Sequence, residues 1–292
     1  MNLILIKPSE VLVNIVDDQR SRYVSLSKND HRTIHIRKHL HKKSGDAVSV
    51  GILGERKGQA SVQLNGDGSA TLILLDTAFV QPPTVPEITV ILAMPFPARL
   101  KALWPVMSSF HAVTRIIIVK GQLSDKEFCE TSALQPKVYE PLIEKGMSQG
   151  VRTRPVQVDI CVDECHVSKE LLQRLGLLND NASQPDDVAR LFLDCGDETM
   201  IPPPAREVVL KHCTRNSTPK SIIAFGPERG WTDEEASTFV NESKFEAVSL
   251  GSSILRVDTA VIAGIGVVSA ALDECQSRIN DSESNKKRKK LS

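Results

Sequence analysis

Six short apolar runs in the second part of the chain, spaced by segments long enough to be helices, constrain the fold more than any other sequence feature. The runs are EITVILAM, RIIIVKG, VQVDICV, RLFLDCG, SIIAFGP and FEAVSLG, which begin at residues 87, 115, 156, 190, 221 and 245. Strands that are apolar on both faces need cover on both sides, so this alternation predicts a mostly parallel sheet between layers of helices. We therefore expect an α/β domain.

The first part of the chain has a different pattern, in which short alternating strands are joined by turns. The runs AVSVGILG and GQASVQL precede the turn at residues 65–68, and ATLILLD follows it. Pro82, Pro83 and Pro86 then interrupt any further strand and favour an extended linker. The sequence predicts a small β-barrel or sandwich in residues 1–80 and the α/β domain in residues 86–275.

Two polar segments are predicted to lie outside these domains. Residues 276–292 have few apolar side chains to bury and end in the basic run KKRKK, so we expect a disordered basic tail. The basic run suits a nuclear address or an RNA tether, and equally a merely solvated tail. Residues 179–187 are predicted to form a surface loop.

The charge balance limits how the chain can bind a polyanion. Lys plus Arg and Asp plus Glu both number 36, so a nucleic-acid site must be a local patch. No run is long enough to span a membrane and the start lacks a cleavage pattern, so we expect a soluble cytoplasmic protein without membrane partners. Its six scattered cysteines predict reduced thiols, and Cys161, Cys165 and His166 lack a second pair at zinc-site spacing, so we expect no metal.

The sequence GPERGWTDEE, residues 226–235, follows an apolar strand and contains the strongest local signals. Thr232 and Glu235 have the spacing of a capping box, which predicts a helix start directly after the loop. Open α/β sheets bind ligands at such strand-to-helix junctions. The alternative is an ordinary turn between a strand and a helix.

A second strand, loop and helix passage has the sequence LGSSILRVDTA, residues 250–260. Gly251 permits a close approach of backbone to a flat ligand, and Arg256 and Asp258 bring charges into an otherwise apolar stretch. The alternative for these two charges is a structural ion pair.

Taken together and in this order, the two passages resemble the GPEGG and LG-x-x-ILR-x-(E/D)-TA signatures of the ribosomal small-subunit RNA uridine-N3 methyltransferases of the SPOUT superfamily. HIRKHL, which begins at His35, and KSGD, which begins at Lys43, resemble the opening of that family more weakly. The resemblance implies a trefoil-knotted parallel α/β domain, an N-terminal PUA-like β-barrel that binds RNA, and a homodimer.

The resemblance also implies a cofactor, S-adenosyl-L-methionine, bound by the two loops. Arg256 is then the candidate catalytic cation for charge on the uracil oxygens, and Glu228 organises the loop or accepts a proton. The expected cofactor-binding residues are Phe225, Gly226, Pro227, Glu228, Gly230, Leu250, Gly251, Ser253, Ile254 and Leu255.

The substrate side departs from the family pattern. Phe96 stands where the family has a lysine, VMSSFHAV replaces a charged helix, and Arg229 replaces a glycine. Two hypotheses therefore remain: an S-adenosylmethionine-dependent methyltransferase acting on uridine N3 of small-subunit ribosomal RNA, or an RNA-binding or ribosome-assembly protein that keeps the cofactor pocket and little activity.

The clearest basic patch lies in residues 31–43, which hold four histidines, two arginines and three lysines without an acidic residue. Such a patch attracts a phosphate backbone in a chain that is neutral overall. We expect ribosomal RNA or the small ribosomal subunit as the partner, and a solvated helix face is the alternative. The expected RNA-binding residues are His35, Arg37, Lys38 and Lys43.

Overall fold

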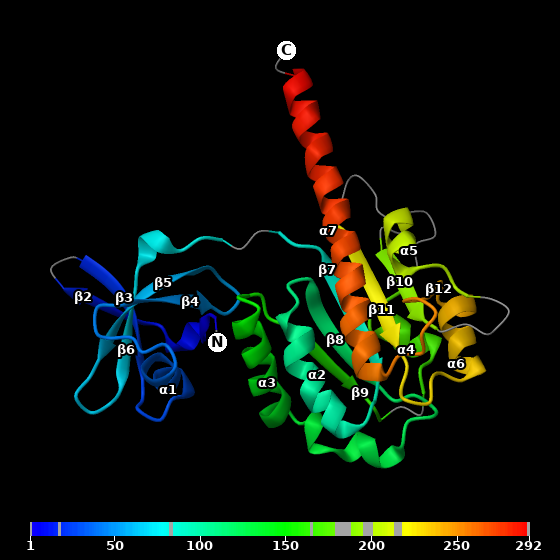
Figure 1. The fold of residues 1–292 in the computed structure, drawn as a ribbon, viewed down its shortest axis with the longest axis horizontal. Coiled ribbons are helices and arrows are strands. Elements are labelled where there is room, and N and C mark those ends of the chain that lie inside the picture. The colour runs from blue at the N-terminus through cyan, green and yellow to red at the C-terminus, as the bar shows by residue number, and fades with distance from the viewer. Residues whose placement is uncertain are drawn as a thin grey trace. The chain divides into compact units, whose positions relative to one another are not determined.

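The computed structural model describes residues 2–16, 19–81, 84–163, 166–178, 188–194, 201–212 and 218–290. The chain divides into an N-terminal unit, Met1–Pro83 with Ile143–Pro155, and a C-terminal unit, Thr84–Leu142 with Val156–Ser292 (Figure 1). The domain boundaries predicted from the sequence place residues 143–155 in the second domain, whereas the structure places them in the N-terminal unit. The loop predicted at residues 179–187 lies outside the described residues.

The N-terminal unit is built on one curled sheet that forms a half-barrel (Figure 1). Its strands are, in spatial order, β1 (Ile4–Ile6), β4 (Ala47–Ile52), β5 (Lys57–Leu64), β6 (Ala70–Leu74), β3 (Gln19–Leu26) and β2 (Leu12–Val16). All neighbours pair antiparallel except β1 and β4. The predicted turn joins β5 to β6, where the Asn65 N–H donates to the Ser69 carbonyl at 3.0 Å.

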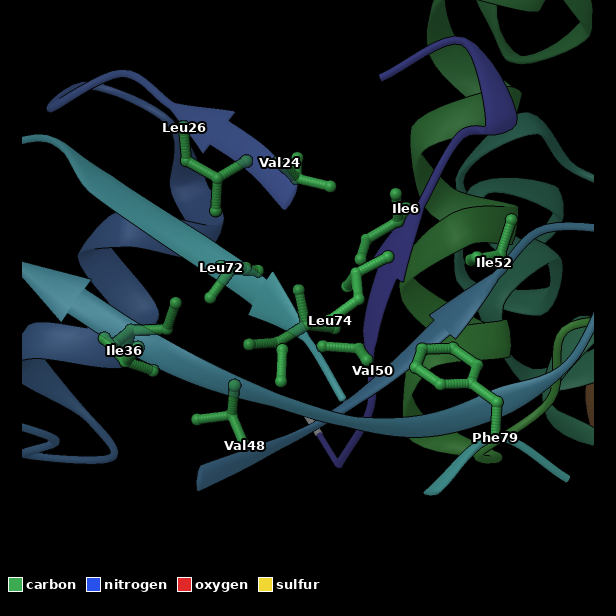
Figure 2. Packing of buried hydrophobic residues seen from close by; sticks show 13 residues of the cluster. Ile6, Val24, Leu26, Ile36, Val48, Val50, Ile52, Leu72, Leu74 and Phe79 are labelled. Atoms are coloured by element: carbon green, nitrogen blue, oxygen red, sulfur yellow. The ribbon is translucent and has the colours of Figure 1, made fainter. Parts of the chain in front are cut away.

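The core of this unit lies between the sheet and helix α1 (His31–Lys38) (Figure 2). Alternate strand residues such as Val48, Val50 and Leu72 point inward, and Ile36 of α1 packs among them. Asp30 caps the helix by accepting a hydrogen bond from the Arg32 N–H at 2.8 Å. Two short 3-10 helices, η1 (Pro8–Glu10) and η2 (Asp76–Ala78), complete the first 83 residues.

Residues 143–155 are hydrogen-bonded to residues next to strands β1 and β4 of the N-terminal unit. The Leu3 N–H donates to the Ser148 carbonyl at 3.1 Å, and the Gly54 N–H donates to the Thr153 carbonyl at 2.8 Å. These long-range bonds explain why the segment groups with the half-barrel. Local sequence periodicity cannot predict hydrogen bonds between residues so far apart in the chain.

The C-terminal unit contains the parallel sheet that the six apolar runs predict, so the α/β prediction is confirmed (Figure 1). The strand order is β12 (Glu246–Val248), β10 (Val188–Leu193), β11 (Lys220–Phe225), β7 (Glu87–Ala93), β8 (Val113–Val119) and β9 (Gln157–Cys161). Every neighbouring pair is parallel. The trefoil knot stays a prediction.

The helices that follow β7 in the chain are as follows: α2 (Pro97–Ser109), η3 (Lys126–Glu130), η4 (Ser132–Leu134), α3 (Pro136–Gln149), α4 (Lys169–Arg174), α5 (Ala205–His212), α6 (Asp233–Ser237), the π-helix η5 (Thr238–Glu242) and, after β12, α7 (Val257–Lys290). Helix α7 contacts α2, α5 and β11. It comes close to the sheet at Gly264, where a Cβ atom would lie 2.8 Å from the Phe225 ring. The carboxyl ends of β10, β11 and β12 lie at one edge of the sheet, as in any parallel arrangement.

Two expectations differ from the structure. Residues 276–290 continue α7, where the sequence predicts a disordered tail, and the buried side chain of Ile279 packs the first turn of this stretch. Cys275 is disulfide-bonded, so the expectation of reduced thiols throughout is wrong at that position. Among the described residues, no helix is long and apolar enough to cross a membrane and no cluster of metal-ligating side chains occurs.

Candidate functional site

A cavity of about 430 Å³ lies at the carboxyl ends of strands β10 and β11, beside the loop that follows β12. Three chain segments far apart in sequence form its walls. They are residues 192–194, residues 225–233 with Ala236, and a last group of Leu250, Gly251, Ser253, Ile254, Leu255, Val257 and Ala260. All ten residues that the sequence analysis named for the cofactor line this one cavity.

The loop after β11 is a tight turn fixed at both ends. The Gly230 N–H donates to the Pro227 carbonyl at 2.9 Å, and Gly230 has φ of +75°, a conformation that favours glycine. A Cβ atom on Gly226 would lie 3.1 Å from the indole ring of Trp231, so this turn has little room for a larger residue.

The predicted capping box anchors the same loop to its neighbours. The Glu235 N–H donates to Thr232 Oγ1 at 3.3 Å, and the Thr232 N–H donates to Glu235 Oε2 at 3.0 Å. Glu235 is buried, and its other oxygen accepts from the Gln122 N–H at 2.9 Å, which ties α6 to the segment after β8. The loop geometry is therefore held by hydrogen bonds on both sides.

The loop after β12 is held at its start and open beyond it. The Ser249 N–H donates to the Pro203 carbonyl at 2.9 Å, and the Ser249 hydroxyl donates to the Pro202 carbonyl at 3.0 Å. Within the part of the chain that the structure describes, the backbone N–H groups of residues 251–255 have no hydrogen-bond acceptor. Backbone donors normally find partners, so these groups are available to a ligand or to water.

One wall of the cavity is aromatic and apolar. Phe225 and Phe192 are buried behind it, and Trp231 lies 6.0 Å from Phe192 between ring centroids. The Trp231 indole N–H is buried and has no acceptor among the described residues. The cavity thus combines a surface for a flat ring with unused hydrogen-bond donors.

The two candidate catalytic residues occupy different positions. Glu228 lines the cavity, and its Oε1 accepts from the Phe96 N–H at 3.1 Å and from Arg99 Nη1 at 2.8 Å. Its Oε2 has no partner among the described residues. Glu228 therefore links this loop to the start of α2 through one oxygen and leaves the other oxygen available.

Arg256 is not among the cavity-lining residues, although Leu255 and Val257 on either side of it are. Its side chain is 68% exposed and its Nε lies 3.3 Å from Asp258 Oδ1, so the ion pair considered as the alternative is present. Exposed ion pairs of this kind contribute little to stability.

Sequence reasoning missed two parts of the site. Residues 192–194 enter the cavity because β10 lies beside β11, and the run RLFLDCG gave the signal of a strand ending in an acidic residue. Arg99 was missed because its partner Glu228 is 129 residues away. No local pattern indicates that pairing.

The basic segment of residues 31–43 contains both structural and exposed cations. Arg32 is 11% exposed and its Nη2 lies 2.6 Å from Glu10 and 2.8 Å from Asp30, so its charge is used within the unit. Arg37 donates to the Gly68 carbonyl at 2.8 Å. Lys38 and Lys43 are exposed and have no carboxylate partner in the described part of the chain.

Two histidines of this segment, His35 on α1 and His39 at its C-cap, are close to one another. The His35 and His39 rings lie 5.4 Å apart between centroids. The predicted RNA-binding residues thus lie on one helix and the loop after it. Arg32, which is not one of them, serves the fold.

Comparison with known proteins identifies the family of this chain. The sequence profile of the RNA methyltransferase domain matches residues 82–269, and the chain therefore belongs to that family. Ribosomal RNA small subunit methyltransferase E of Treponema pallidum (strain Nichols) is 25% identical over 273 residues, which cover 92% of this chain and 91% of that protein. The family that the two loop motifs indicate is confirmed.

Solved structures show the same fold over nearly the whole length. Ribosomal RNA small subunit methyltransferase E from Neisseria gonorrhoeae, bound to S-adenosyl methionine, has a TM-score of 0.60 at 17% identity, covering 92% of this chain and 97% of that one. A Legionella pneumophila protein in complex with SAM has a TM-score of 0.60 at 17% identity, covering 93% and 98%.

Proposed function

We propose that this chain is an S-adenosylmethionine-dependent methyltransferase that acts on N3 of a uridine in small-subunit ribosomal RNA. The observation that supports this most is the cavity itself, in which two glycine-containing loops enclose an aromatic wall and unused backbone donors. The related proteins with bound S-adenosylmethionine and the relative from Treponema pallidum support the same cofactor and the same class of substrate.

The residues of the cavity fit this cofactor. The apolar wall at Phe192, Phe225 and Leu250 suits an adenine ring, and the cavity of about 430 Å³ is within the usual range for small-molecule sites. The N–H groups of residues 251–255 and the Trp231 indole N–H supply donors for its polar groups. When bound, the cofactor supplies an electrophilic methyl group.

The chain's own residues position the acceptor and handle its proton. Uracil N3 becomes nucleophilic as its proton leaves, and the developing charge spreads to the neighbouring carbonyl oxygens. Glu228 Oε2 accepts that proton, and the Arg256 guanidinium stabilises the charge. Positioning and electrostatics carry the rate enhancement, so no protein nucleophile is needed.

In this proposal the N-terminal unit binds the RNA. Lys38, Lys43 and Arg37 place cations on an exposed helix and loop, and His35 lies on the same helix as Arg37 and Lys38. Contacts of this kind position a phosphate backbone and carry no sequence information.

Helix α7 carries the proposed homodimer interface. Its solvent-facing stripe includes Ile262, Gly266 and Ala270, which are small or apolar and allow close helix packing. A twofold arrangement is the common solution for such a surface. Light scattering is expected to give the mass of two chains, and a single-chain mass at high micromolar concentration would contradict it.

Methyl incorporation tests the function directly. Purified protein, labelled S-adenosylmethionine and unmodified small ribosomal subunits should yield labelled RNA, and nucleoside mass spectrometry should identify N3-methyluridine. Isothermal calorimetry on the same protein measures cofactor binding separately. Cofactor binding without methyl transfer to any RNA would instead support the second hypothesis, an RNA-binding or ribosome-assembly protein. The phenylalanine at position 96, where the family pattern has a lysine, favours that hypothesis.

A further inference from the structure

A second cavity, of about 220 Å³, lies on the other side of the loop after β11. Pro227, Glu228 and Arg229 line both cavities, so the two share this loop as a common wall. The remaining lining comes from the end of β7 and the start of α2 and from the segment that includes η3. Its apolar members are Met94, Phe96, Leu123 and Phe128.

Phe96 is a large apolar residue left in contact with solvent. Its side chain is 51% exposed, although burying such a ring usually stabilises a protein. The Phe128 ring packs against it edge to face, with centroids 5.3 Å apart and an interplanar angle of 87°. The Phe96 N–H donates to Glu228 and fixes its backbone. Phe96 therefore presents an exposed ring, positioned by Phe128 and Glu228, on which another ring can stack.

Two guanidinium groups accompany this ring. Arg99 is paired with Glu228 at 2.8 Å, beside the loop that both cavities share. Arg229 is 67% exposed and its Nη2 lies 3.8 Å from Asp125, a separation that leaves it able to move toward a phosphate. Aromatic faces combined with arginine are the features that bind unstacked bases in single-stranded RNA.

We propose that this second cavity receives one unstacked pyrimidine base of the RNA, with Phe96 stacking on it and Phe128 holding the Phe96 ring. The inference rests on the proposed function, since the shared wall sets the base beside the cofactor cavity. Stacking on the exposed face of Phe96 holds the base in this cavity. The cavity of about 220 Å³ is suited to a single base and is smaller than its neighbour of about 430 Å³.

The test compares two probes on the full-length protein. One is a short RNA strand with a single uridine among abasic ribose-phosphate units, and the other is the same strand with every base removed. Fluorescence anisotropy measures both affinities. Stacking on one aromatic side chain should give the uridine strand an advantage of about tenfold.

Substitutions at Phe96 decide whether that advantage comes from this ring. Phe96→Ala should reduce it to less than about twofold, Phe96→Trp should keep it, and cofactor affinity should stay unchanged in both. Ile201→Ala is the matched control, because Ile201 is 64% exposed in the same unit but does not line the cavity. Thermal melting confirms that each variant is folded.

Three results separate the possible failures. An advantage that survives in Phe96→Ala overturns the inference, and so does a wild-type protein that binds both strands equally or neither. A wild-type protein that prefers the uridine strand but does not bind S-adenosylmethionine contradicts the proposed function instead.

Discussion

The cofactor cavity and the basic segment of residues 31–43 are made from different parts of the polypeptide. The cavity takes its shape from backbone, through turns at Gly230 and Gly251 and through the capping box that follows the first of them. The basic segment depends on the charges of exposed side chains such as Lys38. Backbone geometry requires particular residues at fixed spacing, whereas an attractive charge can sit at many positions. The cofactor cavity can therefore be recognised in the sequence by a motif, whereas the basic segment can be recognised only by its composition.

Arg256→Ala is expected to have the largest effect, on methyl transfer alone. A cation that acts on the acceptor in the transition state is worth about 2 to 4 kcal/mol, so kcat should fall while cofactor affinity stays the same. Single-turnover rates and calorimetry measure the two quantities. Asp258→Asn is the control, because it removes the ion-pair partner and leaves Arg256 in place. Equal losses of binding and melting temperature in Arg256→Ala would show a structural role.

Gly251→Val should weaken cofactor binding by about 1 to 3 kcal/mol, since a branched residue is strained at φ of +119°. A Cβ atom there would meet no protein atom within 4 Å, so the expected cost lies in the backbone and in the occupied space. Gly54→Val is the matched control, because Gly54 has φ of +76° and equally open surroundings in the N-terminal unit. Equal cofactor affinities in the two variants would contradict the assignment of this loop.

Replacing Arg37 and Lys38 together by alanine should have a smaller effect, on RNA binding alone. The slope of log affinity against log salt should fall by about one to two, because each phosphate contact contributes close to one. Filter binding across a salt series measures the slope. An unchanged slope would leave the basic tail as the next candidate.

Arg32 belongs to the same basic segment, but we expect it to stabilise the N-terminal unit and not to bind RNA. The hydrogen bond from Arg32 lowers the pKa of Glu10 below its ordinary value of 4.5. A carboxyl with a depressed folded pKa stabilises the fold above that ordinary value and loses this contribution as pH falls through the folded pKa. The melting-temperature gap between wild type and Arg32→Met should therefore be widest near neutral pH and narrow below about pH 4.5. A gap independent of pH would contradict the pairing.

The sequence predicted those parts of the molecule that depend on local pattern. Each of the six apolar runs became a strand of the parallel sheet, and Thr232 with Glu235 formed the predicted capping box. It did not predict contacts between distant residues, such as Arg99 with Glu228 or Leu3 with Ser148. It also missed the length of α7, because the burial of Ile279 depends on what the helix packs against.

The inclusion of residues 143–155 in the N-terminal unit affects how the protein can form during synthesis. The half-barrel strands leave the ribosome first, yet the partners of Leu3 and Gly54 follow only after the first strands of the C-terminal sheet. The N-terminal unit therefore cannot complete its structure before part of the next unit has been translated. A cut at the proline linker would likewise release a half-barrel that lacks one of its own segments.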